Sequence, residues 1–270
     1  MDVREAARRT LAAGSARVWT RNFLDPPVSH PLVATFLMTA EGVADLTRRR
    51  VRLEIAESPE MEAALQRIAS KWPWLAVEDD DESTDEVQLA TVVIAGRRYV
   101  GSGQHWTLGE HGSQLDNPAW ILDALAGAGG ARRVGREHVR GTACERLALE
   151  PVDLRAAVRA SNGSLELPSH GHLENPTLRG DIWVDGDGLV RRVVWSQPPR
   201  GRPRLRRGEA PHSLWHSAEL WDFGLPVSIE VPDPPEPLTD APPFVRILLE
   251  AGTALWGMRR DYMRRQRRAD

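Results

Sequence analysis

Short stretches of β-branched, aromatic or alternating residues follow one another along most of this 270-residue chain, with turn residues between them. Such stretches predict β-strands. Helical stretches interrupt them without regular alternation, which favours an α+β fold with one large antiparallel sheet of roughly ten strands over a doubly wound parallel sheet. We expect strands within residues 15–24, 31–40, 44–55, 86–95, 97–102, 105–108, 130–150 (a hairpin through Gly141), 179–195, 212–224 and 225–231.

Helix signals occur at four places in the first 231 residues. Residues 3–13 are helix formers that end at Gly14, and residues 151–160 form one more short helical stretch. Ser58-Pro59 and Asn117-Pro118 each place a capping side chain directly before a proline, which is typical of a helix N-terminus. We therefore expect a large antiparallel sheet that carries a few helices.

The end of the chain differs in composition from the rest. Residues 232–243 contain six prolines and predict an extended spacer. Beyond it, apolar residues such as Phe244, Leu248 and Leu255 recur at helical spacing among arginines. We therefore expect a main domain over residues 1–231, a spacer over 232–243 and an amphipathic basic helix over 244–270.

The sequence DGDG at residues 185–188 allows either a calcium loop or a hairpin turn. An EF-hand loop that starts at Asp185 needs an oxygen ligand at its fifth position and a glutamate at its twelfth, but this sequence has Leu189 and Ser196 there. Both flanks alternate as strands do. We therefore expect a tight hairpin turn without calcium.

No constellation for catalysis, metal binding or cofactor binding is recognisable. The histidine pairs 170/172 and 212/216 lack a carboxylate or cysteine at ligand spacing, so we predict no metal. Cys144 lies within a predicted strand and has no sign of a poised nucleophile. We expect no cofactor and no catalytic residue; a cleft that gathered Asp116, His138 and Glu145 would be needed to support an enzyme. The net charge of -3 favours no nucleic-acid partner.

Tryptophan is unusually abundant, with ten residues in the chain. Several fall in or beside predicted strands, among them Trp106, Trp183 and Trp195. A tryptophan buries a large apolar area and also needs a partner for its N–H group, so it suits a packed core as well as a cavity wall. The sequence leaves both alternatives open.

The order and the amino-acid sequences of the motifs resemble those of the LolA-like superfamily, and within it those of the actinobacterial lipoproteins of the LppX/LprG type. The most specific pieces are VGREHVRG (134–141) and DIWVDGDGLVRR (181–192). The resemblance covers most of residues 3–233. It implies a strongly curved antiparallel half-barrel whose concave face is covered by helices, and a non-enzymatic protein that holds a lipid or another hydrophobic ligand between sheet and helices.

Residues that alternation or helical spacing directs toward such a cavity are its expected lining. These predicted ligand-binding residues are Phe36, Met38, Leu53, Ile55, Trp106, Leu122, Leu125, Trp183 and Trp195. Each could equally belong to a packed core.

Two functions remain as competing hypotheses. The first is a carrier or sensor of a lipid or another hydrophobic small molecule. The second is a protein-interaction module, as the resemblance to RseB-like regulators implies, that acts through the C-terminal helix or the basic loop 200–207. Residues 244–268 could contact a membrane surface or a protein partner. The signal peptide and lipidated cysteine of the relatives are not found here, which predicts a cytoplasmic location as written, possible membrane association, or an extracytoplasmic location if an export signal is missing.

Overall fold

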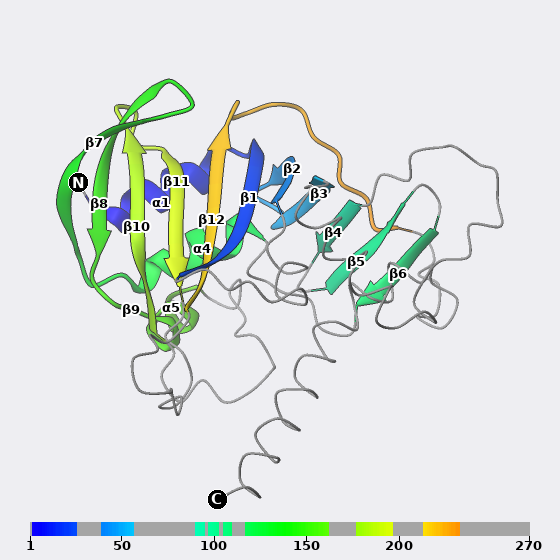
Figure 1. Ribbon diagram of the computed structural model, residues 1–270, viewed down its shortest axis with the longest axis horizontal. Helices are drawn as coiled ribbons and strands as arrows, with labels where there is room; N and C mark the ends of the chain where they lie inside the picture. Colours follow the sequence, from blue (N-terminus) through cyan, green and yellow to red (C-terminus); the bar gives the residue numbers. More distant parts are fainter. Residues whose placement is uncertain are drawn as a thin grey trace, which may run out of the picture.

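In the computed structural model, residues 2–25, 39–56, 90–94, 97–102, 105–109, 117–161, 177–196 and 213–232 are described. They form one twelve-stranded sheet in which every paired strand is antiparallel to its neighbour (Figure 1). The strands are β1 (Ser15–Asp25), β2 (Thr39–Asp45), β3 (Arg50–Ala56), β4 (Ala90–Ile94), β5 (Arg97–Ser102), β6 (His105–Gly109), β7 (Ala131–Val139), β8 (Thr142–Leu149), β9 (Val152–Asp153), β10 (Thr177–Asp185), β11 (Val190–Ser196) and β12 (Ser213–Trp221).

The strand order shows two meanders joined at one seam. The order is β6-β5-β4-β3-β2-β1-β12-β11-β10-β8-β7, with β9 paired to β10 outside this path. β1 and β12, the first and last strands among the described residues, pair in the middle of the sheet. Among the described residues β6 and β7 are the two edges, so the sheet is open, and the expected large antiparallel sheet is confirmed.

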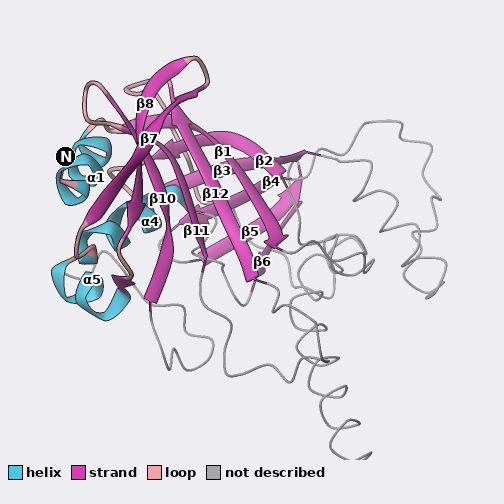
Figure 2. Cartoon of the chain, turned by 60° about the vertical axis from the view of Figure 1, so that its left-hand side comes forward, coloured by secondary structure: helices cyan, strands magenta, loops and turns pink. Residues whose placement is uncertain are grey.

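The helices are α1 (Val3–Ala12), α4 (Pro118–Ala124) with the 3₁₀ turn η3 (Leu125–Gly127), and α5 (Leu154–Ala160). Each α-helix begins at a side-chain cap, from Asp2, Asn117 and Asp153, as the capping residues in the sequence require. They lie together on one side of the sheet (Figure 2). We call the sheet face toward them the inner face and the opposite face the outer face.

Polar contacts hold the helices to the strands. Asp123 of α4 accepts two hydrogen bonds, each 2.9 Å long, from the Arg49 guanidinium in the turn between β2 and β3. Asn117 donates to the Arg49 carbonyl oxygen. Thr10 of α1 accepts from the backbone N–H of Val190 at the start of β11. The helical layer is therefore fixed to both meanders.

The main hydrophobic core fills the space between the helices and the inner face. Alternate strand residues such as Val18, Val51 and Ile182 point into it and meet Ile121 and Leu125 from the helices. These side chains are at most 1% exposed, so this part of the inner face is fully packed. Burial of this apolar surface is the main source of the fold's stability.

Two glycines on the inner face mark where neighbouring strands approach each other most closely. A Cβ atom on Gly42 in β2 would overlap the Arg52 carbonyl of β3, and one on Gly180 in β10 would overlap the Val194 carbonyl of β11. Glycine within a strand permits such close approach and sharp bending. The two positions allow both meanders to curve around the helices (Figure 2).

The DGDG segment is a hairpin turn between β10 and β11, as expected. The Asp185 carboxylate is buried and accepts hydrogen bonds from the backbone N–H groups of Asp187 and Leu189, 3.0 and 2.8 Å long. Its second oxygen accepts from Arg191. Asp185 is thus the residue that organises the turn.

The strand boundaries that the sequence predicted between residues 41 and 50 were wrong. Glu41, Gly42 and Val43, expected to separate two strands, lie inside β2, and the stretch 44–55 is broken by a turn at residues 46–49. The Asp45 carboxylate accepts from the backbone N–H of Arg48, and Arg49 adopts φ 54°. These contacts make the turn without glycine, while Gly42 serves the bend within the strand.

Residues 225–231 do not form the strand that alternation predicts. β12 is already paired on both sides, with β1 and β11, so no position beside β12 remains for this segment. The segment instead crosses the outer face, where Ser15 donates to the Leu225 carbonyl, Arg50 donates to the Ile229 carbonyl, and Ile229 packs beside Tyr99.

Candidate functional site

The side chains on the inner face change from apolar to polar along the strands. On β1, Ala16 and Val18 are completely buried beneath the helices, whereas Thr20 and Asn22, two and four residues further on the same side, are polar and partly exposed. On β12, the side chains on this face likewise change from the apolar Leu220 to the polar His216. The described helices therefore cover one end of the inner face. We call the other end, which no described helix covers, the uncovered end.

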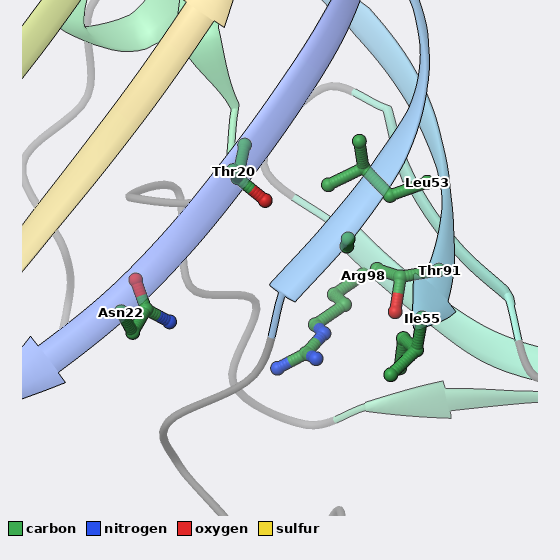
Figure 3. Close-up of a pocket in the computed structure, with 7 residues that line it drawn as sticks. Thr20, Asn22, Leu53, Ile55, Thr91 and Arg98 are labelled. Carbon is green, nitrogen blue, oxygen red and sulfur yellow. The ribbon is translucent and has the colours of Figure 1, made fainter. Parts of the chain in front are cut away.

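A small pocket with a cavity volume of about 20 Å³ lies at this uncovered end. Five successive strands, β1 to β5, contribute its wall (Figure 3). The lining residues are Thr20, Asn22, Ala40, Leu53, Ile55, Thr91 and Arg98. Apolar and polar side chains thus share one concave surface, which is typical of small-molecule sites.

Asn22 connects the pocket to a buried aromatic pair. Asn22, His216 and Trp195 occupy one row of the sheet, on β1, β12 and β11. His216 Nδ1 lies 2.7 Å from Asn22 Oδ1, and its ring stacks on Trp195 at a centroid distance of 5.4 Å. With Nδ1 donating to Asn22 Oδ1, the Asn22 amide nitrogen lies on the pocket side, as Figure 3 shows.

The Thr91 hydroxyl oxygen, on the pocket wall, and the Trp195 indole nitrogen are buried polar atoms with no hydrogen-bond partner among the described residues. Thr91 is 2% exposed and Trp195 is 1% exposed, so water does not reach their side chains freely. A buried hydroxyl without a partner costs about 1–3 kcal/mol, so Thr91 marks the pocket as a place where a further partner atom would stabilise the protein.

Arg98 places a positive charge at the pocket. It lies on the inner face of β5, opposite Val93 of β4, and its guanidinium extends toward the space between Asn22 and Ile55 (Figure 3). The other described lining residues are uncharged.

The predicted lining residues on the inner face separate into two groups. Leu53 and Ile55 line the pocket, and Trp195 lies one row away beside His216. Leu122 and Leu125 are completely buried in the main core. Phe36 and Met38 lie outside the described residues, although Met38 directly precedes β2. Their role in ligand binding remains a prediction.

Trp106 and Trp183 lie on the outer face, so the predicted orientation was wrong for these two. Trp106 is opposite Gly101 and packs with Tyr99 and Ile229. Trp183 donates from its indole nitrogen to Glu137, 2.9 Å away, beneath the guanidinium groups of Arg146 and Arg192.

The physical reason is that both faces of this sheet are covered. Segment 225–231 covers part of the outer face, and arginine side chains cover another part, so a buried tryptophan does not identify the inner face.

Five pocket residues were missed by the sequence prediction: Thr20, Asn22, Ala40, Thr91 and Arg98. A signal for two of them was present. Within β1 the alternating positions 16, 18, 20 and 22 pass from apolar to polar, which indicates the point where one face leaves the core. The others could not be found because their strand partners are not encoded locally.

Ionisable groups on the outer face have structural partners. Hydrogen bonds from Trp183 and then Arg146 lower the pKa of Glu137 below its ordinary 4.5. Burial is the main cause that raises the pKa of the Cys144 thiol, which disfavours the reactive thiolate.

The other residues and segments that the sequence analysis named either have a structural partner or lie outside the described residues. Glu145 forms an ion pair with Arg133. Three others lie outside the described residues: Asp116, the segment 233–270 and the basic loop 200–207. Among the described residues, no helix has both the length and the apolar character that a membrane crossing requires.

No protein-family model matches the chain, and no curated protein matches it. Solved structures similar to it include lipoprotein LppX of Mycobacterium tuberculosis, with 12% identity, a TM-score of 0.45, and coverage of 84% of this chain and 98% of that chain. LprF of Mycobacterium bovis has 13% identity, a TM-score of 0.44, and coverage of 85% and 94%. The Pseudomonas aeruginosa MucA/MucB complex has 12% identity, a TM-score of 0.31, and coverage of 80% and 57%.

At TM-scores below 0.5 the similarities do not align sites residue by residue, so the pocket is defined by this chain's own geometry.

Proposed function

We propose that this chain binds a lipid or another hydrophobic small molecule in the pocket at the uncovered end of the inner face, as a carrier or sensor and without catalysis. The observation that carries the proposal is that the described helices pack one end of the inner face completely, whereas at the other end the described residues form a small, partly apolar pocket. A curved sheet that does not close on itself leaves such a concavity, which side chains or a ligand must fill.

The lining supports an apolar ligand. Ala40, Leu53 and Ile55 form a continuous apolar wall across β2 and β3, because Ala40 and Ile55 are opposite each other in the ladder. All three are less than 9% exposed and continue the inner face outward from the main core. An acyl chain laid against this wall would remove its own apolar surface from water.

Two pairs of connected strand ends lie beside the pocket. β1 ends and β2 begins near the pocket, since Asn22 and Ala40 both line it, and the same holds for β3 and β4 through Ile55 and Thr91. The predicted lining residues Phe36 and Met38 belong to the connection between β1 and β2.

The test is to fill the pocket and measure binding of an uncharged apolar dye. N-phenyl-1-naphthylamine becomes fluorescent when it leaves water, and we expect saturable binding to the wild type. Ala40→Phe places a large ring against the apolar wall and is expected to weaken dye binding about tenfold or more. Glu41→Phe, which adds the same ring to the neighbouring exposed position of β2, is the matched control and keeps wild-type affinity.

Circular dichroism and urea unfolding check that both variants remain folded. Native mass spectrometry of the purified chain should additionally detect a co-purified hydrophobic ligand. Absence of dye binding to the folded wild type, or equal binding by Ala40→Phe and wild type, would contradict the proposal.

A further inference from the structure

Strand β7 lies at one end of the sheet, so one side of its backbone has no strand partner among the described residues (Figure 1). The motif VGREHVRG (134–141) makes up most of this strand and the turn that follows it. An open edge presents N–H and C=O groups that can pair with a further strand, and proteins either protect such an edge or use it for binding.

The hairpin turn determines which backbone groups point to the open side. Residues 140–141 form a two-residue turn with φ 46° and 81°, and Val139 lies opposite Thr142. In such a hairpin the two residues next to the turn exchange hydrogen bonds, and every second pair along the strands then does the same. The N–H and C=O groups of Arg136 and His138 therefore point away from β8. No other strand in the described ranges pairs with them.

The exposed side chains along this edge carry positive charge. Arg132, Arg133 and Arg136 are all exposed. Arg133 pairs with Glu145, whereas Arg132 and Arg136 form no ion pair with any described residue. The one carboxylate of the strand, Glu137, is engaged by side chains of β8 and β10. The edge therefore has an excess of positive charge, which complements an acidic partner.

The same features disfavour a second copy of this chain as the partner. The register with β8 shifts between Arg133 and Gly135, so Val134 lies in a bulge, where it is 46% exposed. Bulges and charged side chains prevent the pairing of identical edges. Two copies of β7 would bring like arginines together, whereas an acidic strand would meet opposite charges. Beyond the bulge, residues 135–139 keep a regular register and leave a short edge for one strand.

We infer that β7 binds an extended acidic segment of a partner protein, which adds as a strand beside residues 135–139. The backbone groups of Arg136 and His138 hydrogen-bond to its main chain. Arg132 and Arg136 attract its carboxylates, and Val134 offers an apolar contact next to them. This surface is separate from the pocket, which β1 to β5 line, so the inference is independent of the proposed function.

The experiment measures binding of short fluorescein-labelled peptides to the full chain by fluorescence anisotropy at low ionic strength. One peptide alternates glutamate with threonine, and the other alternates lysine with threonine. We expect saturable binding of the acidic peptide, about tenfold or more tightly than the basic one, because like charges repel at this edge. Added salt should weaken the binding.

N-methylated peptides distinguish strand pairing from attraction between charges alone. Two forms of the acidic peptide carry N-methyl groups, one at every glutamate and the other at every threonine. The N–H groups of alternate residues in a strand point to the same side, so one of the two forms loses the hydrogen bonds to β7. We expect that form to bind about tenfold more weakly than the parent peptide, since each lost bond contributes about 0.5–1.5 kcal/mol.

Variants locate the binding at β7. His138→Pro removes an N–H group that points to the open side and leaves the ladder with β8 intact, since proline is tolerated at such edge positions. It is expected to weaken binding about tenfold, and His138→Ala is its matched control. Arg136→Glu should weaken binding at least as much, whereas Arg52→Glu, the same charge change at an exposed position of β3, keeps wild-type affinity. Circular dichroism checks that all four variants are folded.

Three results would overturn the inference. The first is that the acidic peptide does not bind the folded wild type. The second is that both N-methylated forms bind as tightly as the parent peptide, and the third is that His138→Pro and Arg136→Glu both keep wild-type affinity. Binding to phosphatidylglycerol vesicles that Arg136→Glu abolishes, without any peptide binding, would identify β7 as a membrane contact instead. None of these results affects dye binding in the pocket, so the proposed function is tested separately.

Discussion

Asp185 shows how one residue decides between two interpretations of a motif. The DGDG segment could have supplied carboxylates to a cation, but the Asp185 carboxylate binds two backbone N–H groups of the turn and the Arg191 guanidinium, 2.6 Å away. Its side chain is 2% exposed. The residue is therefore part of the local structure of the hairpin, and its neighbour Asp187 is exposed.

We predict that Asp185→Ala lowers the free energy of unfolding by about 2 kcal/mol or more, because it leaves the Leu189 N–H group and the Arg191 charge without their partner. Asp187→Ala, which removes a carboxylate from the same turn, should change stability by less than about 0.5 kcal/mol. Urea unfolding followed by tryptophan fluorescence measures both values. Equal losses for the two variants would show that Asp185 does not organise the turn.

At the scale of elements, β2 illustrates why glycine can be misinterpreted in a strand. Gly42 was expected to separate two strands, but it lies between Val18 of β1 and Leu53 of β3 on the inner face. The absence of a side chain allows the β3 backbone to approach where the sheet bends. The true turn follows later, at residues 46–49, and is stabilised by Asp45.

We predict that Gly42→Ala lowers the free energy of unfolding by about 2–3 kcal/mol, since the new methyl group would overlap the Arg52 carbonyl and force β2 and β3 apart. Gly135→Ala in β7 is the control, because nothing lies within 4 Å of its added Cβ atom. Denaturant unfolding of the two variants gives the comparison. If Gly42→Ala were as stable as Gly135→Ala, the close approach would not be required for the fold.

At the scale of the whole molecule, the chain is joined through its first and last strands. β1 pairs with β12 from Arg17–Trp221 to Asp25–Ser213, and this ladder connects the meander β2–β6 to the strands β7–β11. The seam joins residues about 200 positions apart in sequence. The curved sheet and the pocket beside β1 therefore depend on the last described strand.

We predict that a chain ending at residue 212, which lacks β12, shows no cooperative unfolding transition. A chain ending at residue 232 should keep both cooperative unfolding and dye binding, because the main domain was predicted to end at residue 231. Circular dichroism during urea titration and the fluorescence assay measure the two properties. Loss of folding in the longer chain would contradict the predicted domain boundary, and cooperative folding of the shorter one would contradict the role of the seam.

The sequence by itself determined the features that depend on local patterns. Alternation predicted most strands, capping residues predicted α4, and glycine with aspartate predicted the hairpins at residues 140–141 and 185–188. The order of motifs also predicted an open antiparallel sheet with helices on one face. These features follow from interactions between residues close in sequence, which a pattern can represent.

Only the tertiary structure decided which face each strand residue occupies and which residues meet. Trp106 and Trp183 alternate like Trp195 but face outward, because segment 225–231 and outer-face arginines bury them there. Arg98 and Thr91 meet Asn22 only because β1 and β5 belong to one curved sheet. A strand pattern has two equivalent faces, and the choice between them depends on packing partners that lie far away in sequence.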